Sequence, residues 1–375
     1  MKLLVGLDAI SDDDGGRVGG KAVALAALQR TGHPVPRSLC LTTEAYELFV
    51  EQASLRAVIH QELGRKSFED MRWEEIWDVA LRIRNRFLRA TVPSKVVAAV
   101  DAQITGHLSE IALAVRSSAP GEDSEGASFA GLHESFVGVR GVQAVIDAIR
   151  GVWASLWSDR ALLYRRELGI DVDTSSMAVV IQELIDGAVS GIAFGVHPTD
   201  PELAVVESVY GLNQGLVDGT IEPDRWTVDR ATGRTVSHTE PSGRRRLVAR
   251  GSETRVEQVP IVLANRPPLE EADLTRVVDA ARAAENLFGS PQDVEWTIAD
   301  GRLVLLQSRP VTTSTADEGD KRAWYLSLTR SIDNLRVLRE RVESELLPEM
   351  DREADEVAER DLAVLDAEGL ADEIE

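Results

Sequence analysis

The amino-acid sequence predicts an α+β protein with two successive subdomains and a C-terminal helical extension. Three observations lead to this expectation. The chain has 375 residues, more than one compact domain usually holds. Short apolar runs bounded by turn residues alternate twice with longer stretches of helical periodicity. Beyond about residue 316, charged residues dominate. We therefore expect subdomains over residues 1–178 and 179–315 and an acidic helical extension over residues 316–375.

The first part of the chain combines a glycine-rich turn with mostly helical sequence. Glycine doublets at 15–16 and 19–20 precede residues 21–30, KAVALAALQR, whose apolar residues recur at helical spacing. Residues 44–105 again have mostly helical periodicity. Residues 111–119, IALAVRSSA, form a short apolar run typical of a buried strand. These elements predict strands next to a helical layer.

The second part of the chain is richer in strand patterns. Three runs, MAVVIQELI, GIAFGVHP and LAVVESVYG, are β-rich and are predicted to be strands of a second sheet. A helix is predicted over residues 269–288. Two further strands, DVEWTI and LVLLQSRP, are joined around Asp300-Gly301, a dipeptide typical of tight hairpins.

Charge and cysteine content exclude several classes of protein. The net charge of −22 argues against nucleic acid or an anionic membrane as a partner, because phosphate-rich surfaces attract clustered Lys and Arg. Residues 315–375 carry 19 acidic and 8 basic residues, so half of this excess is local. Cys40 is the single cysteine, which rules out an internal disulfide or a thiolate zinc cage. With no signal-like or membrane-spanning segment in the sequence, we expect a cytoplasmic protein.

Two cationic side chains stand where a phosphate could bind. Lys21 follows a glycine doublet at a helix start, where backbone N–H groups and the helix dipole favour an anion. Arg116 ends an apolar strand and offers a planar fork to phosphate oxygens. A glycine-rich loop, residues 120–131, follows and includes Ser128, Ala130 and Gly131. The plain alternatives are a helix cap with a solvated lysine and a surface salt bridge.

The predicted hairpin could hold a divalent cation. Glu295 and Gln307 are 12 residues apart and would supply hard oxygen ligands for Mg²⁺ if they shared a face. A two-residue turn would put Gln307 on the other face, so we expect a three-residue loop, residues 300–302, which pairs the two directly. Arg309 would then lie on the same face. The alternative is an exposed polar face on an edge hairpin.

Residues around the end of the MAVVI strand could contact a purine base. Gln182, Glu183 and Leu184 lie where the chain passes between sheets, so backbone groups could bind the edge of the base. Leu184 or Val180 could cover its face. Glu207, late in the strand LAVVES, could reach ribose hydroxyls. A glutamate just after a strand is, however, usually solvent-facing.

Five separated motifs in this order resemble one known family. VGGKAVAL, VRSSAPGEDSEGASFAGLHESF, VIQELI, DVEW and LLQSRP are similar to the nucleotide-binding portion of the phosphoenolpyruvate synthase and pyruvate phosphate dikinase family. Rifampicin-type phosphotransferases and phenylphosphate synthase belong to the same group. The resemblance covers about residues 15–313 and implies an ATP-grasp fold that binds ATP and Mg²⁺ between two α+β subdomains.

The resemblance also implies roles for individual residues. Lys21 and Arg116 would contact the ATP phosphates, and Arg309 would lie beside them. The other implied ligands are Glu295 and Gln307 for Mg²⁺, with Asp293 in support, Gln182, Glu183 and Leu184 around the adenine, and Ser128, Ala130 and Gly131 in the loop that covers the phosphates.

One family element is missing from this sequence. Members relay a phosphoryl group through a histidine in a Thr/Ser-His-Ala context on a separate domain, and this chain contains no such segment. We therefore expect a histidine-domain phosphocarrier partner that phosphorylates a small hydroxyl compound, of the phenol or alcohol type. The alternatives are the front part of a single-chain enzyme and a non-catalytic ATP-sensing module.

Overall fold

Residues 1–317 form one compact unit of the computed structural model, and residues 318–375 form a second. The structure describes residues 2–67, 70–108, 111–121, 132–167, 175–197, 200–250 and 253–311, together with Ser344, Leu347, Pro348 and Arg352. The rest of the expected C-terminal extension lies outside the described residues. Over the described part of the chain, no helix has the length and apolar character needed to cross a membrane.

The first sheet has five antiparallel strands in the order β1-β2-β5-β3-β4. They are β1 (Leu4–Gly6), β2 (Ser38–Leu41), β3 (Leu113–Ser118), β4 (Ser135–Val139) and β5 (Ala178–Glu183). The sequence placed the MAVVIQELI run, now β5, in the second sheet, and this was wrong because β5 pairs with β2 and β3. A continuous apolar run fits the centre of either sheet, since both of its faces are buried. The chain therefore leaves the first sheet after Glu183, beyond the expected boundary at residue 178.

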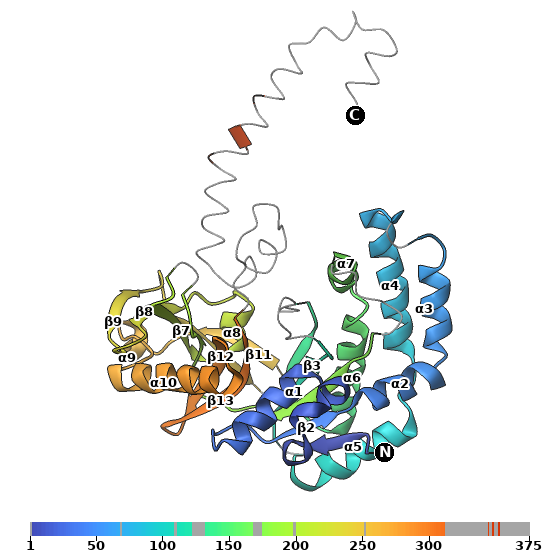
Figure 1. The fold of residues 1–375 in the computed structure, drawn as a ribbon, viewed down its shortest axis with the longest axis horizontal. Coiled ribbons are helices and arrows are strands. Elements are labelled where there is room, and N and C mark those ends of the chain that lie inside the picture. The colour runs from blue at the N-terminus through green and yellow to red at the C-terminus, as the bar shows by residue number, and fades with distance from the viewer. Residues whose placement is uncertain are drawn as a thin grey trace, which may run out of the picture. The chain divides into compact units, whose positions relative to one another are not determined.

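Six helices build the main apolar core on one face of this sheet (Figure 1). They are α2 (Thr43–Gln52), α3 (Leu55–Leu63), α4 (Trp73–Arg89), α5 (Ser94–His107), α6 (Val142–Ser155) and α7 (Asp159–Glu167). Phe49 stacks on Trp153 with ring centroids 4.9 Å apart, and Phe87 packs edge-on against Phe49 at 5.7 Å. The indole of Trp153 donates to the Met177 carbonyl at 3.0 Å, so the polar end of this buried ring is paired.

Helix α1 (Gly15–Arg30) covers the opposite face of the first sheet and also reaches the second. Val18, Ala22 and Leu25 pack with strand residues of the first sheet. Leu28, one turn further on, belongs instead to the core of the second sheet. Two short 3-10 helices, η1 (Leu7–Ala9) and η2 (Asp12–Asp14), precede α1. Helix α1 therefore joins the two halves of the unit.

The second sheet has eight strands, six of them in the order β11-β10-β7-β6-β12-β13, with β8 on β7 and β9 on β8. They are β6 (Val189–Phe194), β7 (Leu203–Gly211), β8 (Asp224–Asp229), β9 (Thr235–Thr239), β10 (Arg245–Arg250), β11 (Glu253–Gln258), β12 (Gln292–Ala299) and β13 (Arg302–Pro310). Helix α10 (Glu271–Phe288) covers one face (Figure 1), and the short helices α8 (Gln214–Val217) and α9 (Ile261–Ala264) lie in connections. The predicted α+β class is confirmed, and both sheets lie within one compact unit.

The β12–β13 hairpin pairs Glu295 with Gln307, as predicted, but by a different route. Its turn has two residues, not three: Asp300 and Gly301 both have positive φ, 50° and 71°, as a type I′ turn requires. A bulge restores the pairing, because the register shifts between Glu295 and Trp296 and leaves Leu306 as the extra residue.

Candidate functional site

A row of mostly polar side chains, called the polar row below, crosses the face of the second sheet that lies opposite α10. Direct strand pairing aligns Gln307, Glu295, Ile192, Glu207 and Arg225 on five neighbouring strands. Directly paired residues point to the same face of a sheet. Helix α10 covers the other face, so this row faces away from α10. The side chains of Glu295 and Glu207 are nevertheless only 7% and 5% exposed, which means that two carboxylates are held in a nearly buried position.

Arg116 of the first sheet reaches this row. It is paired with Val180 on the sheet face that α1 covers. Its Nη1 lies 3.2 Å from Glu295 Oε2 and 3.3 Å from Gln307 Oε1, within hydrogen-bonding distance of both oxygens. The structure therefore brings together three candidate residues from separate motifs. A cationic donor holds together the carboxylate and the amide oxygen proposed as metal ligands.

The residues around Glu295 fit a magnesium ion. Carboxylate and amide oxygens are the ligand types that Mg²⁺ prefers. The Oδ1 atom of Asn213 is also buried there, with no hydrogen-bond partner among the described residues. The pKa of Asp218 is raised above its usual value, mainly by burial, although a hydrogen bond with the Gln214 side chain acts in the opposite direction. The Glu295 carboxylate also raises this pKa, which indicates a negative potential around Glu295. In the described part of the chain, no group of three or more His, Cys, Asp and Glu side chains is placed to hold a metal ion, so the ligands proposed here include amide oxygens.

Asp293 and Arg309 form a buried ion pair two residues along the same hairpin. Nε and Nη2 of Arg309 donate to Asp293 Oδ2 at 2.8 and 2.7 Å, and both side chains are about 5% exposed or less. Asp293 is two residues from Glu295 on β12, and Arg309 is two residues from Gln307 on β13. Residues two apart on a strand point to the same face of the sheet, so all four side chains share one face. Asp293 thus fixes the orientation of the Arg309 guanidinium.

The glycine turn of α1 places Lys21 at the end of β3. Gly19 has φ of 76°, and a Cβ atom there would lie 2.1 Å from the Ser118 carbonyl oxygen, so only glycine fits. The Ser118 hydroxyl donates to the Val18 carbonyl at 2.7 Å and accepts from the Ala22 N–H at 3.3 Å. Lys21 Nζ then donates to Ser117 Oγ at 3.2 Å. Lys21 and Arg116 are thereby anchored at neighbouring positions of one strand end.

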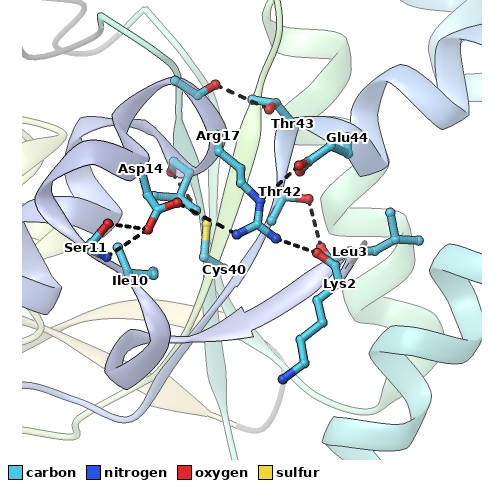
Figure 2. A network of polar contacts seen from close by, with 12 residues as sticks. Lys2, Leu3, Ile10, Ser11, Asp14, Arg17, Cys40, Thr42, Thr43 and Glu44 are labelled. Atoms are coloured by element: carbon cyan, nitrogen blue, oxygen red, sulfur yellow. Dashed lines mark hydrogen bonds and ion pairs between the residues drawn. The ribbon is translucent and has the colours of Figure 1, made fainter.

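A second polar network fixes the start of α1 before this turn (Figure 2). Arg17 donates through Nε to Glu44 at 2.9 Å and through Nη2 to the Lys2 carbonyl at 2.9 Å. Burial acts to raise the pKa of Glu44, but hydrogen bonds from Thr42 and Arg17 outweigh it and hold that pKa below its usual value. Burial strongly raises the pKa of the Cys40 thiol in this network, so Cys40 is a packing residue and not a nucleophile.

The three residues predicted around adenine have separate contacts. The Gln182 amide donates to the carbonyl of Leu306, the bulged residue of the hairpin, at 3.2 Å. Glu183 pairs with Arg37 at 2.8 Å. Leu184 packs against an apolar cluster that includes Ile192 of the polar row, so an apolar surface lies beside the polar side chains. The backbone N–H groups of Glu183 and Leu184 donate to Arg37 and Ala112 carbonyls, which leaves the Leu184 side chain as the better candidate for a base contact.

Glu207 lies in the same polar row as Glu295, where Arg225 Nε is 3.7 Å from its Oε1. The predicted loop residues Ser128, Ala130 and Gly131 lie outside the described residues. The structure adds Gly19, Ser118 and Asn213 to the site. The glycine doublet signals Gly19, and Ser118 lies in a motif already singled out, but no pattern in the sequence points to Asn213.

A family model described as pyruvate phosphate dikinase, AMP/ATP-binding domain, matches residues 16–327. The chain belongs to this family. A probable phosphoenolpyruvate synthase of Methanothermobacter thermautotrophicus is 32% identical over 319 residues, which are 84% of this chain and 46% of that protein. A rifampicin phosphotransferase of Streptomyces sviceus is 35% identical, over 83% of this chain and 36% of that one. A phosphoenolpyruvate synthase of Aeropyrum pernix is 33% identical, over 83% and 42%.

These comparisons confirm the resemblance predicted from the five motifs and identify the domain as nucleotide-binding. This chain spans less than half the length of each of the three relatives named. Among solved structures, a D-alanine–D-alanine ligase from Bacillus anthracis aligns over 85% of this chain and 68% of its own, at 12% identity and a TM-score of 0.30, which is too weak to support a conclusion.

Proposed function

We propose that this chain binds Mg-ATP and acts as the ATP-dependent part of a dikinase-like phosphotransferase. The contact of Arg116 with both Glu295 and Gln307 is the observation that carries the proposal. It brings a cation suited to phosphate and two hard oxygen ligands to one point between two sheets. A nucleoside triphosphate with its metal ion requires this combination of groups.

The nucleotide would be divided between apolar and polar parts of the site. Leu184 and Ile192 belong to one apolar cluster and would cover the adenine. Glu207 and Ile192 are directly paired on β7 and β6, so the Glu207 carboxylate would accept hydrogen bonds from the ribose hydroxyls beside the base. Gln182 would act mainly by tying the hairpin bulge to β5.

The cations would bind and orient the phosphates. Lys21 and Arg116 come from the first sheet and its helix, and Arg309 comes from the second sheet, so the phosphates would be held from both sides. Glu295 and Gln307 would hold Mg²⁺, which when bound neutralises phosphate charge. Arg116 Nη1 contacts the same two oxygens in the structure. Binding of Mg-ATP would therefore transfer the Arg116 guanidinium from these oxygens to the phosphates.

The phosphoryl acceptor would be a histidine on a partner protein. A histidine nitrogen would attack the β-phosphorus, the bond from this phosphorus to the oxygen bridging the α-phosphate would break, and AMP would leave. Water would take the terminal phosphoryl group as inorganic phosphate, and the phosphohistidine would phosphorylate a small hydroxyl compound. Lys21, Arg116 and Arg309 are cations and would stabilise the negative charge that develops on the phosphates. None of them is a suitable nucleophile for the relay, so the acceptor would have to be the histidine.

The length of the relatives favours a second construction for the same chemistry. Each carries the region similar to this chain within a polypeptide more than twice as long as that region. In that arrangement, the acceptor histidine and the ATP site would belong to one chain. The two constructions predict the same products from ATP and differ only in whether a second polypeptide must be added.

Calorimetry and product analysis test the proposal. The purified chain should bind Mg-ATP more tightly than metal-free ATP, and its slow turnover should release AMP instead of ADP. Imidazole, added as a small substitute for the histidine side chain, should increase AMP formation. The Glu295→Gln variant is the control for contaminating ATPases. Wild type that binds no Mg-ATP, or that forms ADP as its only product, would overturn the proposal.

A further inference from the structure

Asn213 occupies a fixed position beside the proposed metal ligands. The strand β7 ends at Gly211, whose φ of 78° turns the chain, and the Leu212 N–H donates to the Leu247 carbonyl at 2.9 Å. The Asn213 carbonyl then accepts from the N–H groups of Leu216 and Val217 at 3.0 and 3.1 Å, at the start of α8. Hydrogen bonds on both sides therefore fix the backbone of Asn213, and its side chain enters the site from a third segment.

One end of the Asn213 side chain contacts Glu295. Nδ2 donates to Glu295 Oε2 at 3.3 Å, and Arg116 Nη1 lies 3.2 Å from the same oxygen. When a metal ion or phosphate draws Arg116 away, the amide contact would remain. Asn213 thus can hold the Glu295 carboxylate in place in both states.

The other end of the side chain has an unused acceptor. Asn213 is only 4% exposed, and its Oδ1 has no hydrogen-bond partner among the described residues. A buried carbonyl oxygen without a partner is unfavourable unless a ligand supplies one. Gln292, a buried amide on the same strand as Glu295, has both ends paired: its Nε2 donates to the Ser290 carbonyl and its Oε1 accepts from Ser308. A buried amide of this sheet can therefore be fully paired within the protein, whereas the Oδ1 of Asn213 and the Oε1 of the neighbouring Gln214 have no partner among the described residues.

We propose that Asn213 is a further residue of the magnesium site, with Nδ2 positioning Glu295 and Oδ1 supplying an oxygen acceptor to the coordination shell of the ion. This inference rests on the proposed function, because it requires a metal-nucleotide complex in this site. The site would then combine one carboxylate with two neutral amides, from Gln307 and Asn213. Such a set binds a hard cation without adding a second negative charge next to Glu295.

Manganese binding tests the role of Asn213 without any measurement of activity. With Mn²⁺ as the probe and a non-hydrolysable ATP analogue present, electron paramagnetic resonance gives the free metal concentration. Asn213→Ala should weaken Mn²⁺ binding about 10-fold to 100-fold, as loss of supporting groups around a metal usually does. Affinity for the metal-free analogue should stay within about twofold. Gln292→Ala is the matched control and should leave both affinities unchanged.

Asn213→Asp separates the oxygen from the amide nitrogen and keeps the shape of the side chain, so it remains informative even if the alanine variant unfolds. It should bind Mn²⁺ at least as tightly as wild type, because the oxygen acceptor is retained and gains charge. If Asn213→Asp loses affinity as Asn213→Ala does, Oδ1 does not supply an acceptor to the metal, and if Asn213→Ala binds Mn²⁺ like wild type, Asn213 has neither role. Wild type without any metal-dependent nucleotide binding would overturn the proposed function, and this inference with it.

Discussion

The two sheets of the compact unit contribute opposite kinds of residue to the site. The first sheet and α1 supply the cations Lys21 and Arg116. The second sheet supplies the oxygens of Glu295, Gln307 and Glu207. Arg309, a cation of the second sheet, is already paired with a buried carboxylate of its own hairpin. Complementary charges therefore meet where the sheets face each other, and neither half holds a complete site.

The two halves also differ in how they are held together. Helices α2–α7 bury a large apolar and aromatic cluster against the face of the first sheet opposite Arg116. The second sheet has a smaller core under α10 and also buries charged pairs, among them Asp293 with Arg309 and Asp224 with Arg244. The first half therefore gains its stability mainly from packing. The second half depends in addition on the pairing of buried charges, so the two halves should respond differently to substitution.

The largest effect is expected from breaking the buried ion pair of the second half. Asp293→Ala removes the carboxylate to which the buried Arg309 guanidinium donates two hydrogen bonds and should lower the free energy of unfolding by about 3–5 kcal/mol. Urea denaturation measures this loss. Glu257→Ala removes a partly exposed partner of the exposed Arg250 and should cost much less. Equal losses in the two variants would mean that buried charges do not hold the second half together.

A smaller effect is expected from the glycine turn of the first half. Gly19→Ala requires an unfavourable left-handed residue and a shift of the Ser118 carbonyl, so we expect a loss of about 2 kcal/mol or more in unfolding free energy. Displacement of Lys21 should weaken ATP binding at least about tenfold. A Cβ added at Gly16 meets nothing within 4 Å, and Gly16→Ala should leave both quantities unchanged. A Gly19 variant as stable as the Gly16 variant would contradict the close approach.

The smallest effect concerns Glu44, whose pKa is held below its usual value of 4.5 in the folded protein. A lowered carboxyl pKa contributes stability above pH 4.5 and loses it as the pH falls through the folded pKa. Glu44→Gln should therefore cost no more than about 1 kcal/mol at pH 7 and progressively less below pH 4.5. Denaturation curves from pH 7 to pH 3 measure this. A cost that stays constant with pH would show that the charge of Glu44 has no role in the network.

The hairpin illustrates how far the sequence could predict the site. The chemistry of Glu295 and Gln307 was sufficient to predict that they pair, but the three-residue loop inferred from parity was wrong. A bulge leaves no signal in the sequence, because Leu306 looks like any apolar strand residue. Its role becomes visible only in three dimensions, where its carbonyl accepts a hydrogen bond from Gln182 of the first sheet.

The misplaced strand and the missed asparagine have related causes. The apolar run of β5 identified a buried strand correctly, but periodicity carries no information about which strands lie beside it. Asn213 follows a turn at Gly211 and begins a four-residue helix, so its contact with Glu295 depends on the return of a distant strand. Local patterns therefore predicted the type of most elements, and failed where tertiary contacts decide a role.

A double-mutant cycle on Mg-ATP binding tests most directly whether the two sheets form one site. Arg116→Ala and Glu295→Gln are made singly and together, and calorimetry gives the binding free energy of each. We predict a coupling energy of at least about 1 kcal/mol between the two residues, as for side chains that share one ligand. A second cycle of Arg116→Ala with Glu257→Gln is the control and should be additive. Additivity within about 0.5 kcal/mol for Arg116 and Glu295 would contradict a shared site.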